Sequence, residues 1–137
     1  MKKRVRAVIV QERSILLIRR IKADKEYWVF PGGGVEELDI SLSTALAREC
    51  KEELGVDVSV GGLLTEEILH SPTGDQSESF FICKILSGVV GTGDGPEFSR
   101  DSKLSGAYRP EWVSLVALPS MNVMPVEARD KVISANL

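Results

Sequence analysis

Short apolar segments with many β-branched residues recur along the chain, and polar or glycine-containing turns separate them, a pattern that predicts strands. The first two segments, 4–10 and 14–20, are three residues apart and predict a hairpin. The other predicted strands are 27–30, 56–69, 77–86 and 111–118. Within 56–69, Gly61 and Gly62 predict an interruption. The pattern therefore predicts a domain built around a sheet.

Two further segments show the apolar spacing of helices instead. The first, 41–55, has Ser41 as a capping residue at its start and Gly55 as a stop signal. The second, 125–137, carries Pro125 in its first turn. One helix between strands and one after them predict an α/β (α+β) fold, in which helices sandwich a mixed β-sheet. The length of 137 residues predicts a single domain, 1–137.

The segment 87–108 fits neither pattern, because it is rich in glycine and polar residues. Connections of this length are uncommon inside a compact domain and are usually either functional or disordered. The sequence leaves both interpretations open, together with a short strand that starts at Gly88.

Composition narrows the class of protein. The net charge of −3 argues against broad electrostatic binding to nucleic acid or to an anionic membrane. No apolar run approaches the roughly 18 residues of a membrane-spanning helix, and the apolar run near the start is too short for a signal peptide. Cys50 and Cys83 are too few for a disulfide framework and predict reduced thiols. We therefore expect a cytoplasmic protein that does not bind membranes.

The helix predicted over 41–55 carries three glutamates near its C-terminal end. On a helical wheel Glu49, Glu52 and Glu53 share one arc. The adjacent arc, which we expect to face the core, holds Leu42, Leu46, Ala47, Cys50 and Leu54. Like charges at these spacings cost about 0.2–0.5 kcal/mol per pair and also oppose the helix dipole. A hard divalent cation such as Mg²⁺ would offset this repulsion, and the alternative is a solvated acidic face.

The neighbouring charges bear on this choice. Glu53 borders the core arc, so its side chain is expected to be partly exposed. Arg48 is expected to pair with Glu52, while Arg48 and Lys51 point away from the line that joins Glu49 to Glu53. Cations of the helix would then leave that pair unneutralised, which favours a bound metal ion.

Immediately before the helix, Phe-Pro-Gly-Gly-Gly (30–34) leads into the segment 35–40. Glycines let a backbone approach a ligand closely, so the loop predicts a phosphate site between a strand end and the acidic helix. A glycine triplet by itself is more often a plain turn, and that alternative stays open.

The segment from Gly33 to Val56 resembles the signature of the Nudix hydrolases, the MutT-like superfamily. That signature has a glycine, five residues, a glutamate, seven residues and then Arg-Glu-apolar-x-Glu-Glu-x-Gly-apolar. Its second half is complete at 48–56. The order of the predicted elements around it is also similar to that family.

The first glutamate of the signature is missing. Counting from Gly34 places it at Ile40, and counting from Gly33 places it at Asp39 with one residue too many before the second half. We interpret this as a one-residue insertion, with Asp39 or Glu37 in place of the glutamate. A catalytically weak nucleotide-binding module on the same scaffold is therefore an alternative to an active enzyme.

The resemblance implies a Nudix fold with a catalytic loop-helix-loop after the Phe-Pro-Gly-Gly turn. It implies a Mg²⁺-dependent pyrophosphohydrolase that cleaves a diphosphate bond in a nucleoside diphosphate linked to another group, with Mn²⁺ as an alternative metal. Glu52 and Glu53 are expected to be the main metal ligands and Glu49 the third. One of these, or Glu97 from the long polar segment as a further ligand, would accept a proton from water. Arg48 completes the catalytic set by holding the preceding loop through carbonyls or a carboxylate.

Residues beside the loop are candidates for substrate binding. Gly33 and Gly34 are expected to approach the phosphates. Arg19 and Arg20 end a strand and point to opposite faces, so at most one contacts phosphate, and we predict Arg20. Tyr27, Trp28 and Phe30 also lie beside the loop. A base is predicted to stack on one of them, for which we choose Trp28, with burial in the core as the alternative.

The expected partner is a small nucleotide, such as a nucleoside triphosphate or an ADP-ribose-like compound, without an extended nucleic-acid surface. Besides the weak binding module, a metal-free acidic domain that works through protein contacts is a third hypothesis. The sequence leaves the oligomeric state open, a dimer included.

Overall fold

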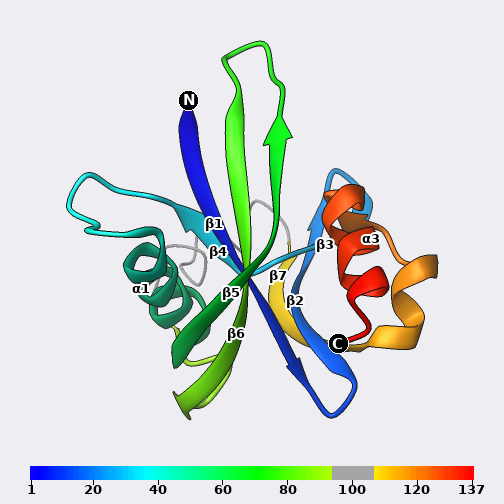
Figure 1. Ribbon diagram of the computed structural model, residues 1–137. Coiled ribbons are helices and arrows are strands. Elements are labelled where there is room, and N and C mark those ends of the chain that lie inside the picture. Colours follow the sequence, from blue (N-terminus) through cyan, green and yellow to red (C-terminus); the bar gives the residue numbers. More distant parts are fainter. Residues whose placement is uncertain (94–106) are drawn as a thin grey trace.

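The computed structural model describes residues 1–93 and 107–137. Its elements, shown in Figure 1, are β1 (Lys2–Gln11), β2 (Ser14–Lys22), β3 (Lys25–Val29), β4 (Gly32–Gly34), α1 (Leu42–Leu54), β5 (Val56–Leu69), β6 (Gln76–Gly88), β7 (Ala107–Ser114), the 3-10 helix η2 (Leu115–Ser120), β8 (Val123–Met124) and α3 (Val126–Ala135). The strands form one eight-stranded sheet in the order β5-β6-β1-β2-β3-β8, and β4 also pairs with β1 and β7 with β2. Both parallel and antiparallel pairings occur, so the sheet is mixed, as predicted.

β1 and β2 form the predicted hairpin, but they pair only near its turn, at Val10–Ile15 and Gln11–Ser14. Beyond these pairs the two strands separate. β1 continues between β6 and β4, and β2 continues between β3 and β7. Figure 1 shows the resulting arms of the sheet diverging from a common crossing.

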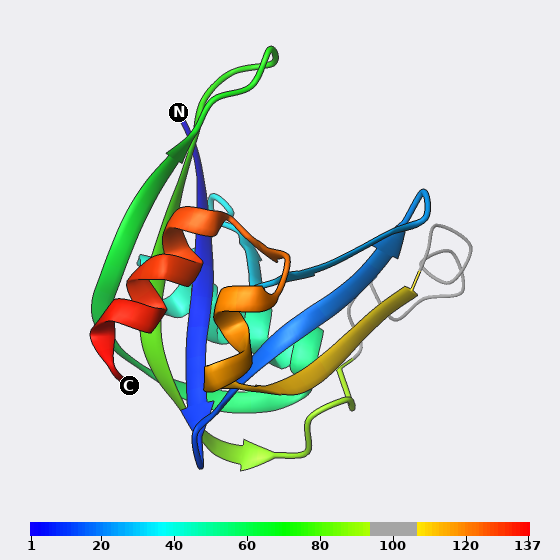
Figure 2. The same ribbon diagram turned by 90° about the vertical axis from the view of Figure 1, so that its right-hand side faces the viewer.

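The helices α1 and α3 lie on opposite sides of the sheet, as Figures 1 and 2 show. Alternation along β1 supplies both sides, because Ala7 and Ile9 belong to the core beside α1 whereas Val8 belongs to the core beside α3. Leu46 of α1 and Val132 of α3 are buried in these two cores. The predicted sheet sandwiched between helices is confirmed.

Local chemistry sets both ends of α1. The hydroxyl of Ser41 accepts a hydrogen bond from the backbone N–H of Thr44 at 3.0 Å and caps the first turn. Gly55 follows the last turn in the left-handed region, with φ of 79°, and its N–H donates to the carbonyl of Lys51. Both ends agree with the predicted boundaries.

The buried face of α1 differs from the predicted one. Ala45 is fully buried and Ala47 is half-buried, so the inclusion of Ala47 in the core arc was wrong. Two successive four-residue steps from Ala45 lead to Glu49 and Glu53, and both are buried. The buried face of α1 is thus rotated toward the glutamates, so that Glu49 and Glu53 are buried.

The last predicted strand, 111–118, is shifted in the structure. β7 ends where Ser114 pairs with Ser14, the first residue of β2, so no further β2 backbone is available to continue the pairing. The chain turns instead into η2, whose first N–H, at Leu115, donates to the carbonyl of Arg13. Pro125 precedes α3 as its N-terminal cap, rather than standing in the first turn. The interruption predicted at Gly61 and Gly62 is a shift of register within a continuous β5.

The long polar segment is only partly described. Gly88 ends β6 rather than starting a new strand, and β7 already begins at Ala107. Whether the segment is functional or disordered falls on residues 94–106, which lie outside the described residues.

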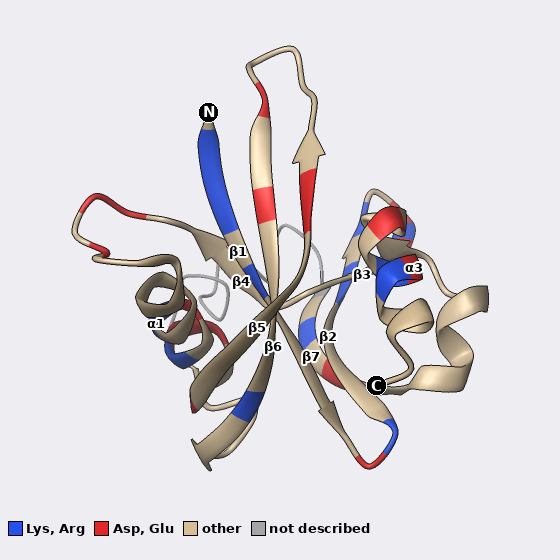
Figure 3. Ribbon diagram, viewed as in Figure 1, with Lys and Arg blue, Asp and Glu red and all other residues tan. Residues whose placement is uncertain are grey.

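One prediction from composition, that both thiols are reduced, can be compared with the structure. Cys50 and Cys83 are free and buried, as expected. Lys and Arg residues are spread over β1, β2, β6 and α3 (Figure 3). Within the described parts of the chain, none of the helices has the length and apolar character needed to cross a membrane.

Candidate active site

A hollow of about 260 Å³ brings the glycine strand, the acidic helix and several basic side chains together. The residues that line it are Arg4, Arg6, Arg20, Tyr27, Val29, Gly32, Gly33, Gly34, Glu49, Glu53 and Tyr108. They come from β1, β2, β3, β4, α1 and β7. Five of them, Arg20, Gly33, Gly34, Glu49 and Glu53, are residues that the sequence predicts for the site.

Glu53 is the most deeply buried carboxylate of this hollow, with 3% of its surface exposed. Its Oε1 accepts a hydrogen bond from the backbone N–H of Gly32 at 2.9 Å. Its Oε2 accepts a hydrogen bond from the hydroxyl of Tyr108. The expectation that Glu53 would be partly exposed was wrong, because the core stripe of α1 passes through it. Both of its oxygens are held in place by neighbouring strands.

Glu49 lies one turn earlier and is also buried, at 9% exposure. Its Oε2 is so close to Gly33 that a Cβ atom there would be only 2.4 Å away. At Gly32 a Cβ would meet the carbonyl oxygen of Val5 at 2.0 Å, and φ there is +144°, so glycine is required. At Gly34 no described atom lies within 4 Å of that position. Close packing therefore needs the first two glycines, while the third is open to the hollow.

Arg48 holds the loop before α1, as predicted. One guanidinium nitrogen, Nη2, donates to the carbonyl of Gly34 at 3.1 Å and to Oδ2 of Asp39 at 2.9 Å, and Nε donates to Oδ1 of Asp39. These bonds from Arg48 hold the pKa of Asp39 below its usual value and raise that of Arg48. Glu37 is exposed, and of the two candidates for the missing glutamate it is Asp39 that binds Arg48. Glu36 of the same loop lies farther from Arg48, with 3.6 Å between its Oε1 and Nη1.

Arg48 also reaches the acidic cluster. Its Nη1 lies 3.0 Å from Oε1 of Glu49 and 3.4 Å from Oε2 of Glu52. The expectation that Arg48 would point away from Glu49 was therefore wrong, because the loop contacts draw the guanidinium across the helix. Lys51 does point away and lies 3.7 Å from Asp57. Part of the repulsion within the cluster is offset by this one arginine.

The metal site expected from the sequence can be compared with this geometry. Within residues 1–93 and 107–137, no group of three or more His, Cys, Asp and Glu side chains is placed to hold a metal ion. Arg48 and Tyr108 instead occupy oxygens of Glu49 and Glu53. The donor set nevertheless fits Mg²⁺ or Mn²⁺, since two buried carboxylates share one hollow. The predicted ligand Glu52 is not among the described residues that line this hollow and pairs with Arg48 instead. Glu97 lies outside the described residues.

Basic side chains also line the hollow. Arg20 stacks on the ring of Tyr108 at 4.8 Å, and its Nε is buried without a hydrogen-bond partner among the described residues. Arg19 turns the other way and pairs with Glu26, as strand alternation predicts. Burial and the neighbouring charge of Arg6 lower the pKa of Arg4. A wall of this kind is suited to phosphate oxygens.

Trp28, predicted to bind substrate, does not line the hollow. It packs against the core cluster beside α3 and is not among the described residues that line the hollow. Its neighbour Tyr27 lines the hollow instead, because successive residues of β3 point to opposite faces. The structure thus favours the alternative reading of Trp28 as a core residue.

Sequence reasoning missed Arg4, Arg6 and Tyr108. The two arginines are two residues apart in the first predicted strand, so strand alternation predicts that both side chains point to the same face. Tyr108 gave no such signal, because its approach to Glu53 depends on the return of the chain after residues 94–106.

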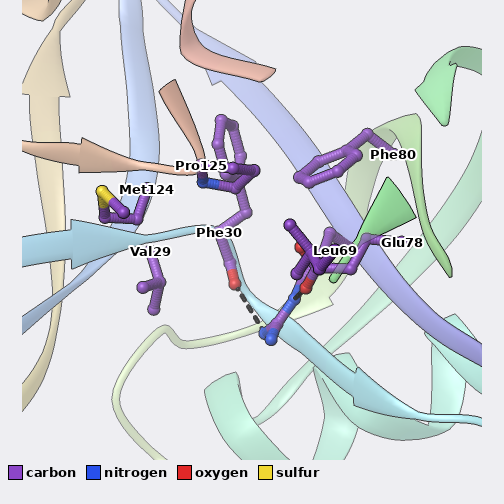
Figure 4. A pocket seen from close by; sticks show the side chains of 8 residues that line it. Val29, Phe30, Leu69, Glu78, Phe80, Met124 and Pro125 are labelled. Atoms are coloured by element: carbon purple, nitrogen blue, oxygen red, sulfur yellow. Dashed lines mark hydrogen bonds and ion pairs between the residues drawn. The ribbon is translucent and has the colours of Figure 1, made fainter. Parts of the chain in front are cut away.

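A second, largely apolar pocket of about 210 Å³ adjoins the hollow. Its lining residues are Arg6, Val29, Phe30, Leu69, Glu78, Phe80, Met124 and Pro125, and Figure 4 shows them. Arg6 and Val29 line both spaces, so the pocket and the hollow meet at these two side chains.

Comparisons with known proteins concern the family and the fold. The NUDIX domain family model matches residues 1–137. A MutT-like protein of Streptomyces ambofaciens is 39% identical over 88 residues, which cover 64% of this chain and 54% of that protein. A CTP pyrophosphohydrolase of Escherichia coli is 44% identical over 59 residues, which cover 42% of this chain and 43% of that protein. The matches span only about half the length of these two relatives.

Solved structures show the same fold. The ORF135 protein of E. coli superposes with a TM-score of 0.73 at 22% identity, covering 99% of this chain and 91% of that one. An ADP-ribose pyrophosphatase of Streptococcus suis superposes with a TM-score of 0.65 at 26% identity, covering 98% and 91%.

Proposed function

The chain belongs to the NUDIX family, and from that premise we propose that residues 1–137 act as one domain with Mg²⁺-dependent pyrophosphohydrolase activity. The bond to be cleaved is a diphosphate bond of a small nucleotide. A nucleoside triphosphate is the proposed substrate, and cytoplasmic location remains a prediction.

One observation carries this proposal: two buried carboxylates and three arginines line a single hollow. Arginine guanidinium groups match the geometry of phosphate oxygens and keep their charge when buried. Glu49 and Glu53 offer hard oxygen donors in the same hollow. A polyphosphate chain would fit between these groups, whereas neither an apolar ligand nor a cation alone would satisfy both.

The side chains have distinct proposed roles. Glu53 and Glu52 would be the main metal ligands and Glu49 the third. A Mg²⁺ ion held there would neutralise phosphate charge and lower the pKa of a bound water. Gly32 and Tyr108 orient the Glu53 carboxylate through their hydrogen bonds. Arg48 keeps the loop against the helix and does not itself line the hollow.

The apolar pocket supports a base-containing substrate. Its volume of about 210 Å³ is below the roughly 300–1,000 Å³ of pockets for drug-sized ligands, so it suits a single ring system. Its junction with the hollow at Arg6 places a base and a phosphate chain within reach of one another. The similarity to a CTP pyrophosphohydrolase supports a nucleoside triphosphate as the substrate. ADP-ribose is the alternative substrate to be tested, because an ADP-ribose pyrophosphatase has a similar fold.

A catalytically weak nucleotide-binding module is the second candidate. Asp39 is engaged with Arg48, and Ile40 is exposed, so neither residue brings the missing first acid of the signature into the hollow. Such a module would bind nucleotides without turning them over.

The test measures phosphate and pyrophosphate release from CTP, UTP and ATP, and formation of AMP and ribose 5-phosphate from ADP-ribose, with Mg²⁺ and with Mn²⁺. The variant Glu53→Gln keeps the size of the side chain but removes its charge, and its kcat should fall by at least about 100-fold. Glu127→Gln, on the exposed side of α3, is the matched control and should retain activity. Nucleotide binding without turnover would favour the weak module. If neither metal nor nucleotide changes the melting temperature, the hypothesis of a metal-free acidic domain that works through protein contacts would be favoured.

A further inference from the structure

The apolar pocket contains a buried carboxylate, that of Glu78, although its other walls are largely apolar. Its walls include Phe30 and Phe80, whose rings meet edge to face at a centroid distance of 5.1 Å. Among the described residues that line the pocket, Arg6 and Glu78 are the charged ones, and Figure 4 labels Glu78 beside Phe80 and Leu69. Glu78 is 5% exposed at its side chain, although β6 could have placed an apolar residue at this position.

The two oxygens of Glu78 are not equivalent. Oε2 accepts a hydrogen bond from Nε of Arg6 at 2.8 Å and lies 3.8 Å from Nε of Arg4. Oε1 makes no hydrogen bond within the described part of the chain. Among the described residues, the fully enclosed side-chain atoms without a partner are Nε of Arg20 and Nε1 of Trp28. Oε1 of Glu78 is therefore not fully enclosed, and Glu78 is one of the residues that line the pocket.

Arg6 fixes this carboxylate in position. Its Nε binds Glu78, and its Nη1 donates to the carbonyl of Phe30 at 3.0 Å, which Figure 4 shows as two dashed lines. The pair is held from β1, β6 and the end of β3, so it cannot easily reorient. An ionised carboxylate only accepts hydrogen bonds. A ring that enters the pocket would thus meet a fixed acceptor in an otherwise apolar wall.

We propose that Glu78 is a specificity-determining residue that selects nucleobases carrying an amino group, cytosine over uracil in particular. This inference rests on the proposed function, because it assumes that the base of the substrate occupies the apolar pocket. An exocyclic amino group donates to Oε1 and satisfies a buried acceptor. The carbonyl that uracil presents at the same position brings two acceptors together, which a site built for a donor rejects.

The experiment compares kcat/KM for CTP and UTP with Mg²⁺ in the wild-type protein and in Glu78→Gln. The glutamine oxygen still accepts from Arg6, and its NH₂ group then faces the pocket as a donor. The wild type should prefer CTP by at least about 10-fold, and the variant should lose that preference or reverse it, mainly through KM. Glu66→Gln, on the exposed side of the neighbouring strand β5, is the control and should keep the wild-type ratio.

A second measurement needs no variant. Cytidine triphosphate with both amino hydrogens replaced by methyl groups lacks the donor, and the wild type should discriminate against it at least as strongly as against UTP. Equal ratios of CTP to UTP in the wild type and in a folded Glu78→Gln, or full use of the dimethylated analogue, would overturn the role of Glu78. If the protein binds nucleotides without hydrolysing them, the same ratios are read from Kd. If it binds none, the proposed function itself fails together with this inference.

Discussion

Gly33 and Glu49 lie in direct contact, since a Cβ atom at Gly33 would be only 2.4 Å from Oε2 of Glu49. The contact joins β4 to α1 and decides where the carboxylate stands in the hollow. Gly33 is not in the left-handed region of the backbone, so space and not conformation demands glycine there. The third glycine of the loop, Gly34, has open space at the same point.

Substitution of these two glycines should therefore have unequal effects. In Gly33→Ala the new methyl group displaces the Glu49 carboxylate, and we expect kcat for nucleotide hydrolysis to fall by at least about 10-fold. In Gly34→Ala no described atom has to move, so activity should stay within about 2-fold of wild type. Steady-state kinetics of both variants is the measurement, and equal activities would contradict this account of Glu49.

Arg48 should matter for stability as well as for activity. Arg48→Ala removes the bonds to Gly34 and Asp39, and we expect a loss of about 1–3 kcal/mol in the free energy of unfolding. The lower half of that range is favoured because the side chain is about one-quarter exposed and solvent screens its charge. Urea denaturation measures the change. Lys51→Ala, whose side chain is mostly exposed, is the control and should change stability by less than about 0.5 kcal/mol.

The same ion pair predicts a dependence on pH. Hydrogen bonds from Arg48 place the pKa of Asp39 below its unfolded value of about 3.9. A depressed pKa stabilises the fold above that value, and the contribution is lost as the pH falls through the pKa of the folded state. Melting temperatures of wild type and Asp39→Asn should therefore differ by a constant amount near neutral pH. The two curves should converge below about pH 4, and parallel curves down to pH 2 would contradict the assignment.

Tyr108 offers a way to separate two of its contacts. Tyr108→Phe removes the hydroxyl that binds Glu53 but keeps the ring under Arg20, so kcat should fall by about 10-fold with little change in KM. Tyr108→Leu removes both contacts and should raise KM as well, because Arg20 loses its aromatic support. Identical kinetic parameters for the two variants would show that the ring does not position Arg20.

The two thiols should be unreactive in the folded protein. Burial raises the pKa of Cys83 to about 11 and raises that of Cys50 as well, so neither forms much thiolate at pH 8. We expect almost no reaction with a disulfide reagent at pH 8 in the native state and both thiols to react after denaturation. Rapid native reaction of either cysteine would contradict its burial.

Much of the candidate site was predictable because it lies in one continuous stretch of chain. The glycine loop and the acidic helix are joined by only a few residues, and Ser41 and Gly55 set the helix ends through contacts with their immediate neighbours. Local interactions of this kind can be recognised from spacing alone. The burial of Glu49 and Glu53 could not be predicted in this way, because it depends on how α1 is rotated about its axis where it packs against β1, β4 and β5.

By itself the sequence determined the sheet with its two covering helices, the acidic helix, the loop before it and the resemblance that joins them. Only the tertiary structure decided which other side chains gather around the hollow and the apolar pocket. Arg6, Glu78 and Tyr108 come from β1, β6 and β7, and they meet through strand pairings between residues far apart in the chain. Such pairings depend on the register of the whole sheet, where a shift of one residue turns every side chain to the other face.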